Sequence, residues 1–135
     1  MSDLDLCYMS ATEALSLFRA RKLSPVELMQ AVIKRAGTVN KKVNAFTFTH
    51  FDEALAAARK AEAKYAQGAR GGGRIGALEG LPVAVKDESW IKGKPTSYGS
   101  LIYKDFVPDV TSPNNERILK AGGIVHARTA TPEFS

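Results

Sequence analysis

The spacing of hydrophobic residues changes at a glycine-rich segment near the middle of the chain, residues 68–80. Before it, apolar residues recur three and four positions apart, which is typical of amphipathic helices. After it, apolar residues come in short continuous runs, which favour strands. We therefore divide the 135 residues into a helical part, 1–67, a glycine-rich connector, 68–80, and a sheet-forming part, 81–135. A chain of this length buries one hydrophobic core, so the three parts form a single domain.

Two serines mark the starts of helices in the first part. Ser10 and Ser24 each stand three residues before a glutamate, which is the spacing of a capping box. A proline follows Ser24, and proline fits the first position of a helix. We expect a helix after each serine and a third, alanine-rich helix over residues 52–67. The aromatic and β-branched residues at 45–49 predict a strand between the second and third helices.

The sheet-forming part has the order strand, helix, strand. Apolar runs at residues 81–87 and 124–127 predict the two strands. Between them, Ser112 followed by proline predicts the start of a helix, and Gly122 predicts its end. A strand–helix–strand order favours a parallel or mixed sheet with helices on its faces. The predicted fold class is therefore α/β, with a mixed β-sheet flanked by α-helices.

The composition excludes several kinds of site and segment. Cys7 is the only cysteine, so an intrachain disulfide and a thiol-bound metal cluster are both impossible. His50 and His126 have no partner at the spacing of a metal site, and we interpret His126 as a structural histidine whose hydrogen bonds are satisfied. No apolar stretch approaches the ~20 residues of a membrane helix, and the N-terminus lacks the pattern of a signal peptide. We expect no metal, no cofactor, no membrane and a cytoplasmic location.

The net charge of +5 raises the alternative of a small basic module that binds nucleic acid. The charges are spread along the chain without a run of five like charges. Arg70 and Arg74 lie in the connector without aromatic neighbours that could stack on bases. Residues 71–76 match G-x-G-x-x-G, but they follow a helix and precede a strand, the reverse of a dinucleotide site, so we interpret them as a linker. We do not expect nucleic acid as a partner, and keep this module only as the alternative from another class.

A charged residue, Lys86, stands at the end of one of the apolar runs. Lys86 follows three apolar residues at the C-terminal end of a predicted strand. Alternation places Lys86 and Ala84 on one face, and a central strand has both faces covered. Desolvation disfavours the charged ammonium and so favours a neutral amine, which can accept a proton. Two structural alternatives stay open: the side chain extends to water, or it pairs with Asp87 or Glu88.

Five segments resemble motifs of the amidase signature family. They keep the order and spacing of that family and read SPVEL at residues 24–28, GLPVAVKD at 80–87, GKPTSYGS at 93–100, ILKAGGIV at 118–125 and TPEF at 131–134. The resemblance implies a mixed sheet between helices, and an enzyme that hydrolyses or transfers the nitrogen of a carboxamide by a Ser–Ser–Lys triad. Lys86 matches the triad lysine, which takes a proton from a bridging serine. The resemblance implies no cofactor.

The chain departs from the family pattern at the serines. Nothing in it resembles the Gly/Ser-rich signature that carries both triad serines, and the family's serine positions are not those of Ser89, Ser97, Ser100 and Ser135. We therefore interpret residues 1–135 as the N-terminal portion of a single, incomplete amidase domain, inactive alone, whose parent acts on a small-molecule amide. Unpaired sheet edges make self-association possible. The alternative within the family is the amide-hydrolysing subunit of a glutamine-dependent tRNA amidotransferase.

Overall fold

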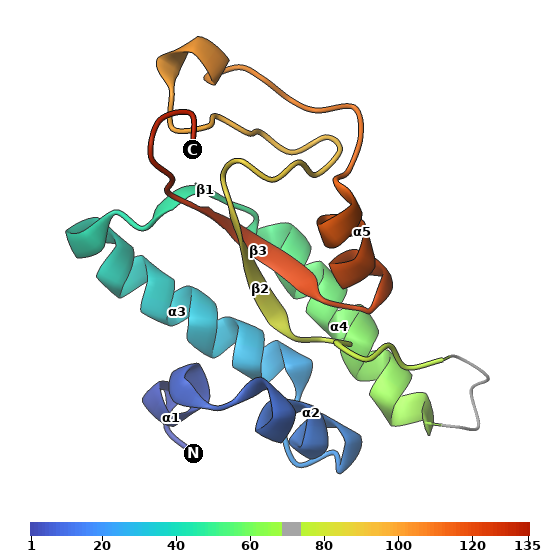
Figure 1. Cartoon of the computed structure of the whole chain (residues 1–135). Helices are drawn as coiled ribbons and strands as arrows, with labels where there is room; N and C mark the ends of the chain where they lie inside the picture. The colour runs from blue at the N-terminus through green and yellow to red at the C-terminus, as the bar shows by residue number, and fades with distance from the viewer. Residues whose placement is uncertain (69–73) are drawn as a thin grey trace.

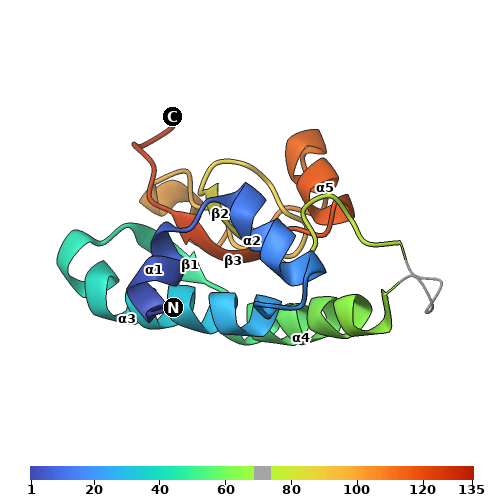
Figure 2. The same cartoon turned by 90° about the horizontal axis from the view of Figure 1, so that it is seen from below.

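The structure, a computed structural model, describes residues 1–68 and 74–135, and it has the expected α/β class. Helices α3 and α4 lie side by side against one face of a small mixed sheet, and α5 lies on the opposite side (Figures 1 and 2). The elements are α1 (Asp3–Tyr8), α2 (Ala11–Arg19), α3 (Pro25–Val43), β1 (Phe46–Thr49), α4 (Phe51–Gln67), β2 (Pro82–Lys86), the short 3₁₀ helix η2 (Leu101–Tyr103), α5 (Pro113–Lys120) and β3 (Ile124–Thr129). No helix in these two ranges is both long and apolar enough to cross a membrane.

The two predicted serine caps are present, one fully and one in half. The Ser24 hydroxyl accepts a hydrogen bond from the backbone N–H of Val26, and the carboxylate of Glu27 accepts one from the Ser24 N–H at 2.8 Å, so the capping box of α3 is complete. At α2, the Ser10 hydroxyl accepts from the N–H of Glu13 at 3.2 Å without the reciprocal bond. Both caps satisfy backbone donors that a helix start leaves free.

Helix α1 was not predicted from the sequence. It is six residues long, starts at a capping box formed by Ser2 and Asp5, and has Leu6 as its one buried residue. A helix of under two turns shows no apolar periodicity, so only the serine–aspartate spacing signals it. It contacts α3, where the ammonium of Lys34 pairs with the carboxylate of Asp3 at 2.5 Å.

Two clusters of buried side chains form the core. The first joins α1, α2 and α3 to the last part of α4 and to the residue before β2, and it contains Leu6, Ala14, Phe18, Leu23, Leu28, Ala31, Tyr65 and Leu81. The second lies between α3, α4 and β3 and contains Met29, Ala54, Ala58 and Ile124. Alanine at two successive turns of α4 lets that helix approach the sheet closely. The predicted apolar face of residues 52–67 is therefore the face that packs against β3.

The sheet has the strand order β1-β3-β2, with β3 in the centre. β2 runs parallel to β3, and β1 runs antiparallel to it, so the sheet is mixed as expected. The predicted strand–helix–strand order is confirmed by β2, α5 and β3, with a long irregular stretch and η2 between β2 and α5. β3 extends two residues beyond the predicted end and so includes Arg128, which is fully buried.

The second half of the predicted connector is held in place by hydrogen bonds. Residues 69–73, which include the start of the proposed linker motif at 71–76, lie outside the described residues. Further on, the N–H of Leu78 donates to the carbonyl of Ala121, and the N–H of Gly80 donates to that of Gly122. The carboxylate of Glu79 is buried and accepts from the ammonium of Lys64 at 2.8 Å. Residues 76–80 are thus a turn that joins α4 to the end of α5.

Gly80 is required in this turn for two reasons. Its φ is +85°, and a Cβ built on it would lie 2.8 Å from Cγ of Pro25. We predict that Gly80→Ala lowers the free energy of unfolding by about 2–4 kcal/mol, the combined cost of a left-handed alanine and of crowding at the start of α3. Gly37, inside α3, is the matched control, because a Cβ there meets nothing within 4 Å. Gly37→Ala should raise the free energy of unfolding by up to about 1 kcal/mol. Urea unfolding of both variants measures the two changes. Equal effects of the two substitutions would contradict this.

His126 lies in the sheet core between aromatic rings. Its imidazole stacks on Phe51, with 6.4 Å between ring centroids, and meets the edge of Phe46 at 5.7 Å. The expectation of a satisfied histidine is wrong for one atom, because Nδ1 is buried and has no hydrogen-bond partner among the described residues. Burial, assisted by the nearby charge of His50, lowers the pKa of His126 to about 4. The folded protein therefore holds this ring in its neutral form.

This low pKa makes stability depend on pH. An unfolded histidine titrates near pH 6.5, so between pH 6.5 and pH 4 the unfolded chain binds a proton at position 126 that the folded chain does not. Stability is therefore lost as the pH falls through this window. We predict a loss of about 2 kcal/mol between pH 7 and pH 5 from this residue, measured by urea unfolding at both pH values. In His126→Leu the dependence should be smaller by that amount. An unchanged dependence would contradict the assignment.

Candidate functional site

The candidate site lies where β2 and β3 end side by side. Because the two strands are parallel, their carboxyl ends meet at one edge of the sheet, the usual position of ligand crevices in α/β folds. Two of the segments that resemble family motifs also meet here, in the upper part of Figure 1. The N–H of Phe134 donates to the carbonyl of Tyr98 at 2.9 Å, and the hydroxyl of Ser100 donates to the carboxylate of Glu133 at 2.8 Å.

Gly99 allows this close approach between the two segments. A Cβ at Gly99 would lie 2.5 Å from the carbonyl oxygen of Thr131, and its φ is +66°. Only glycine adopts this conformation without strain and leaves room for the neighbouring backbone. The glycine of the 93–100 segment is therefore a packing requirement of this site.

Lys86 ends β2 and projects from its exposed face. Its Nζ donates to the hydroxyl of Ser135 at 3.0 Å and lies 3.4 Å from a carboxylate oxygen of Glu88. The side chain is 44% exposed. The expectation that both faces of this strand are covered is wrong for the described residues, because Ala84 and Lys86 are both exposed in them. The pairing with Glu88, one of the two structural alternatives, is present.

Glu88 brings a negative charge to this edge. Its carboxylate accepts from the hydroxyl of Thr131 at 3.3 Å. The hydroxyl of Ser135, and with it the ammonium of Lys86, holds the pKa of Glu88 below its usual range. The ammonium of Lys86 thus contacts a serine hydroxyl and an ionised carboxylate at this edge of the sheet.

A buried ionic cluster lies directly behind Lys86. The side chains of Asp87 and Arg128 are both 0% exposed, with Nε of Arg128 3.9 Å from Oδ1 of Asp87. Burial lowers the pKa of Arg128, and the charge of Asp87 opposes that shift. Sequence reasoning missed this cluster, because position 128 lay beyond the predicted end of its strand. A charged residue within an otherwise apolar strand was the available signal.

The serines near the site have different partners, which are fixed by the local turns. Ser97 binds Asp87, Ser100 binds Glu133, and the hydroxyl of Ser89 accepts from the side-chain amide of Asn115 at the start of α5. Among the described residues, no group of three or more histidine, cysteine, aspartate and glutamate side chains could hold a metal ion.

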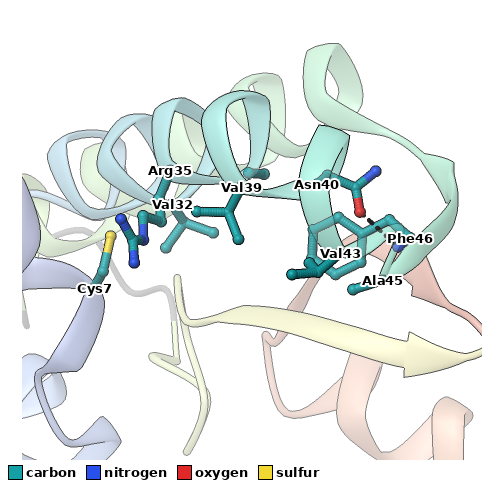
Figure 3. A pocket seen from close by; sticks show the side chains of 9 residues that line it. Cys7, Val32, Arg35, Val39, Asn40, Val43, Ala45 and Phe46 are labelled. Carbon is teal, nitrogen blue, oxygen red and sulfur yellow. Dashed lines mark hydrogen bonds between the residues drawn. The ribbon is translucent and has the colours of Figure 1, made fainter.

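An apolar hollow of the surface lies elsewhere. It has a volume of about 210 Å³ and lies between α1, α3 and the start of β1 (Figure 3). Cys7 and Arg35 lie at one end and Asn40 at the other, where its side-chain oxygen accepts from the N–H of Phe46 at 2.9 Å. Burial raises the pKa of the Cys7 thiol, which disfavours the reactive thiolate. This hollow lacks the pairing of a lysine with a serine hydroxyl that is found at the strand ends.

Comparison with known proteins gives a consistent family. The sequence model of the Amidase family matches residues 27–135. The chain is 34% identical to the A-type subunit of the glutamyl-tRNA(Gln) amidotransferase of Acidothermus cellulolyticus over 97% of its length, and 34% identical to the indoleacetamide hydrolase of Bradyrhizobium diazoefficiens over 93%. These alignments cover 25% and 23% of the two relatives. The chain thus spans about a quarter of the length of the curated relatives it matches.

Solved structures agree with this assignment. The structure superposes on that of a fatty acid amide hydrolase with a TM-score of 0.86 and 25% identity, over 96% of this chain and 22% of that one. A bacterial aryl acylamidase of the amidase signature family superposes with a TM-score of 0.84. Since the family match extends over most of the chain and includes both strands that carry the candidate site, the chain belongs to the amidase signature family.

Proposed function

We propose that Lys86 is the base in the hydrolysis of a small-molecule carboxamide to a carboxylate and ammonia or an amine. The observation that carries the proposal is the position of its amine, at the carboxyl end of a strand that runs parallel to its neighbour, where α/β folds form their ligand crevices. Lys86 also stands where the family motif that residues 80–87 resemble has its triad lysine. Both triad serines belong, in this proposal, to a part of the amidase domain that residues 1–135 do not contain, so this segment alone is inactive.

The proposed reaction uses the amine as a proton acceptor and donor. Neutral Lys86 takes a proton from a bridging serine, which takes one from the attacking serine. The attacking oxygen bonds to the amide carbon, the C–N bond breaks, and the leaving nitrogen receives the proton that Lys86 held. Water then attacks the acyl-enzyme ester by the same relay and releases the carboxylate. Every proton is returned, so the cycle consumes no cofactor.

A side chain without an amine at position 86 should not support this reaction cycle. We predict that Lys86→Met, in the whole protein that carries this segment, lowers kcat/KM for a simple carboxamide by at least about 100-fold, the usual contribution of a general base. Ammonia release measures the rate. Lys92→Met is the control, since Lys92 is an exposed lysine six residues further on, in the irregular stretch after β2, and forms no ion pair among the described residues. Full activity of Lys86→Met would refute the proposal.

A second candidate function has support from the relatives. Several of them are named as the A-type subunit of a glutamyl-tRNA(Gln) amidotransferase, at 32–37% identity. In that function the same lysine would act on glutamine, and the released ammonia would pass to a partner protein. We predict that the whole protein hydrolyses simple carboxamides without any partner protein. Ammonia release from glutamine only, and only in a complex, would instead favour the amidotransferase.

We also retain three further expectations as proposals. The sides of β1 and β2 that face away from β3 have no strand partner among the described residues, and we propose that another strand pairs there, from the same domain or from a second copy. The free thiol of Cys7 fits a reducing compartment, and we propose the cytoplasm. Small amides, and not nucleic acid, remain the proposed ligands.

A further inference from the structure

Asp87 follows Lys86 directly and is held from every side. Its carboxylate accepts from the backbone N–H of Ser97 at 3.0 Å and from the hydroxyl of the same residue. Its own N–H donates to the carbonyl of Thr129 at 2.9 Å, and its carbonyl accepts from the N–H of Tyr98 at 3.0 Å. The residue therefore ties the end of β2 both to β3 and to the turn at residues 97–100.

Arg128 completes the arrangement from the central strand. Its Nη2 donates to the carbonyl of Ser89 at 2.6 Å and to the hydroxyl of Thr96 at 3.1 Å. The guanidinium thus holds both ends of the stretch that leaves β2 and returns at residue 96. We call Asp87, Ser97, Thr96 and Arg128 the Asp87 cluster.

Lys86 and Asp87 differ in how tightly their side chains are held, and this difference suggests a role for Asp87. Lys86 has a long, partly exposed side chain whose ammonium forms one hydrogen bond, to Ser135, and one ion pair, with Glu88, among the described residues. Its backbone, by contrast, is fixed by the residue that follows it. The direction in which the amine leaves the strand, and the distance it can reach, therefore depend on the Asp87 cluster rather than on contacts of the amine itself.

The electrostatic cost of burying Asp87 and Arg128 also indicates a role beyond packing. Two fully buried charges lose their hydration, and a 3.9 Å separation recovers only part of it. Two atoms of Arg128, Nε and Nη1, have no hydrogen-bond partner among the described residues. An apolar pair would fill this volume with less electrostatic cost, but it would not bind both the N–H and the hydroxyl of Ser97.

We propose that Asp87 is a positioning residue, which aligns the amine of Lys86 with the serine that gives up its proton. This inference rests on the role proposed for Lys86. A displacement of the base by about 1 Å costs on the order of 100-fold in rate, since the proton must be transferred across a short hydrogen bond. The side chain of Asp87 is fully buried and so out of reach of a substrate, and its loss should therefore affect kcat and leave KM nearly unchanged.

The test compares three variants of the whole protein. Asp87→Asn keeps the shape of the side chain but removes its charge, and should lower kcat for a simple carboxamide by about 100-fold with KM nearly unchanged. Ser97→Ala removes one bond of the cluster and should lower kcat by about 10-fold. Asn115→Ala is the control, because Asn115 is also buried and binds the same irregular stretch, at Ser89 and Trp90, without contacting Asp87. It should lose stability but keep kcat.

The outcomes separate the two proposals. If Lys86→Met is inactive while Asp87→Asn and Ser97→Ala keep full kcat, the positioning role is wrong and the base stands. If Lys86→Met is fully active, the proposed function itself is wrong. If all three variants lose kcat in proportion to their loss of stability, Asp87 has only a structural role and the inference is overturned. Should Asp87→Asn not fold, Ser97→Ala against Asn115→Ala decides the question by the same comparison of kcat and KM.

Discussion

The parallel pairing of β2 with β3 is the constraint on which the rest of the structure depends. It brings distant parts of the chain to one edge, so that the end of the first strand meets the segment that follows the second. Such a pairing cannot be closed by a tight turn, and here the connection contains the irregular stretch, η2 and α5. The length of this connection is what lets the segment at residues 93–100 fold back over the strand ends, where it meets the segment at residues 131–134 and forms the candidate site.

The antiparallel strand β1 supports this pair from the other side. Its register places Thr49 opposite Ala127, and the next residue, His50, donates its N–H to the carbonyl of His126. Helix α4 begins directly afterwards and packs its alanines against β3. The central strand is thus fixed by a strand on each side and by a helix on one face. That rigidity is what a site at its end needs, since small displacements of a reacting group are costly.

Most of the architecture could be predicted because it depends on local chemistry. Serine caps, alanine spacing and short apolar runs each act within a few residues, and they indicated α2 to α5, and all three strands to within two residues of their ends. Helix α1 was not predicted, because a helix of fewer than two turns shows no apolar periodicity. The surroundings of His126 were predicted wrongly for another reason. Whether a buried ring nitrogen has a hydrogen-bond partner depends on contacts between β1, α4 and β3, and no local sequence pattern encodes those contacts.

The place of Lys86 on its strand was predicted, but the surroundings of its side chain were not. Alternation placed Ala84 and Lys86 on one face of β2, and that is where they lie. Whether a face is covered, however, depends on the elements packed against it, and the strand pattern does not contain that information. The same limit hid the Asp87 cluster, since its members come from a strand end, a turn and a second strand.

In the proposed function, Lys86 must meet two requirements of a base, a neutral amine and a fixed direction. A lysine accepts a proton only in its neutral form, which a covered, apolar setting favours and an ionised neighbour such as Glu88 opposes. Its direction must nevertheless be fixed. In our proposal Asp87 supplies the fixed direction from the interior, where hydrogen bonds are strong because water is absent. The covering must come from whatever packs against the Ala84–Lys86 face, and in the proposed function that is also where the two serines approach.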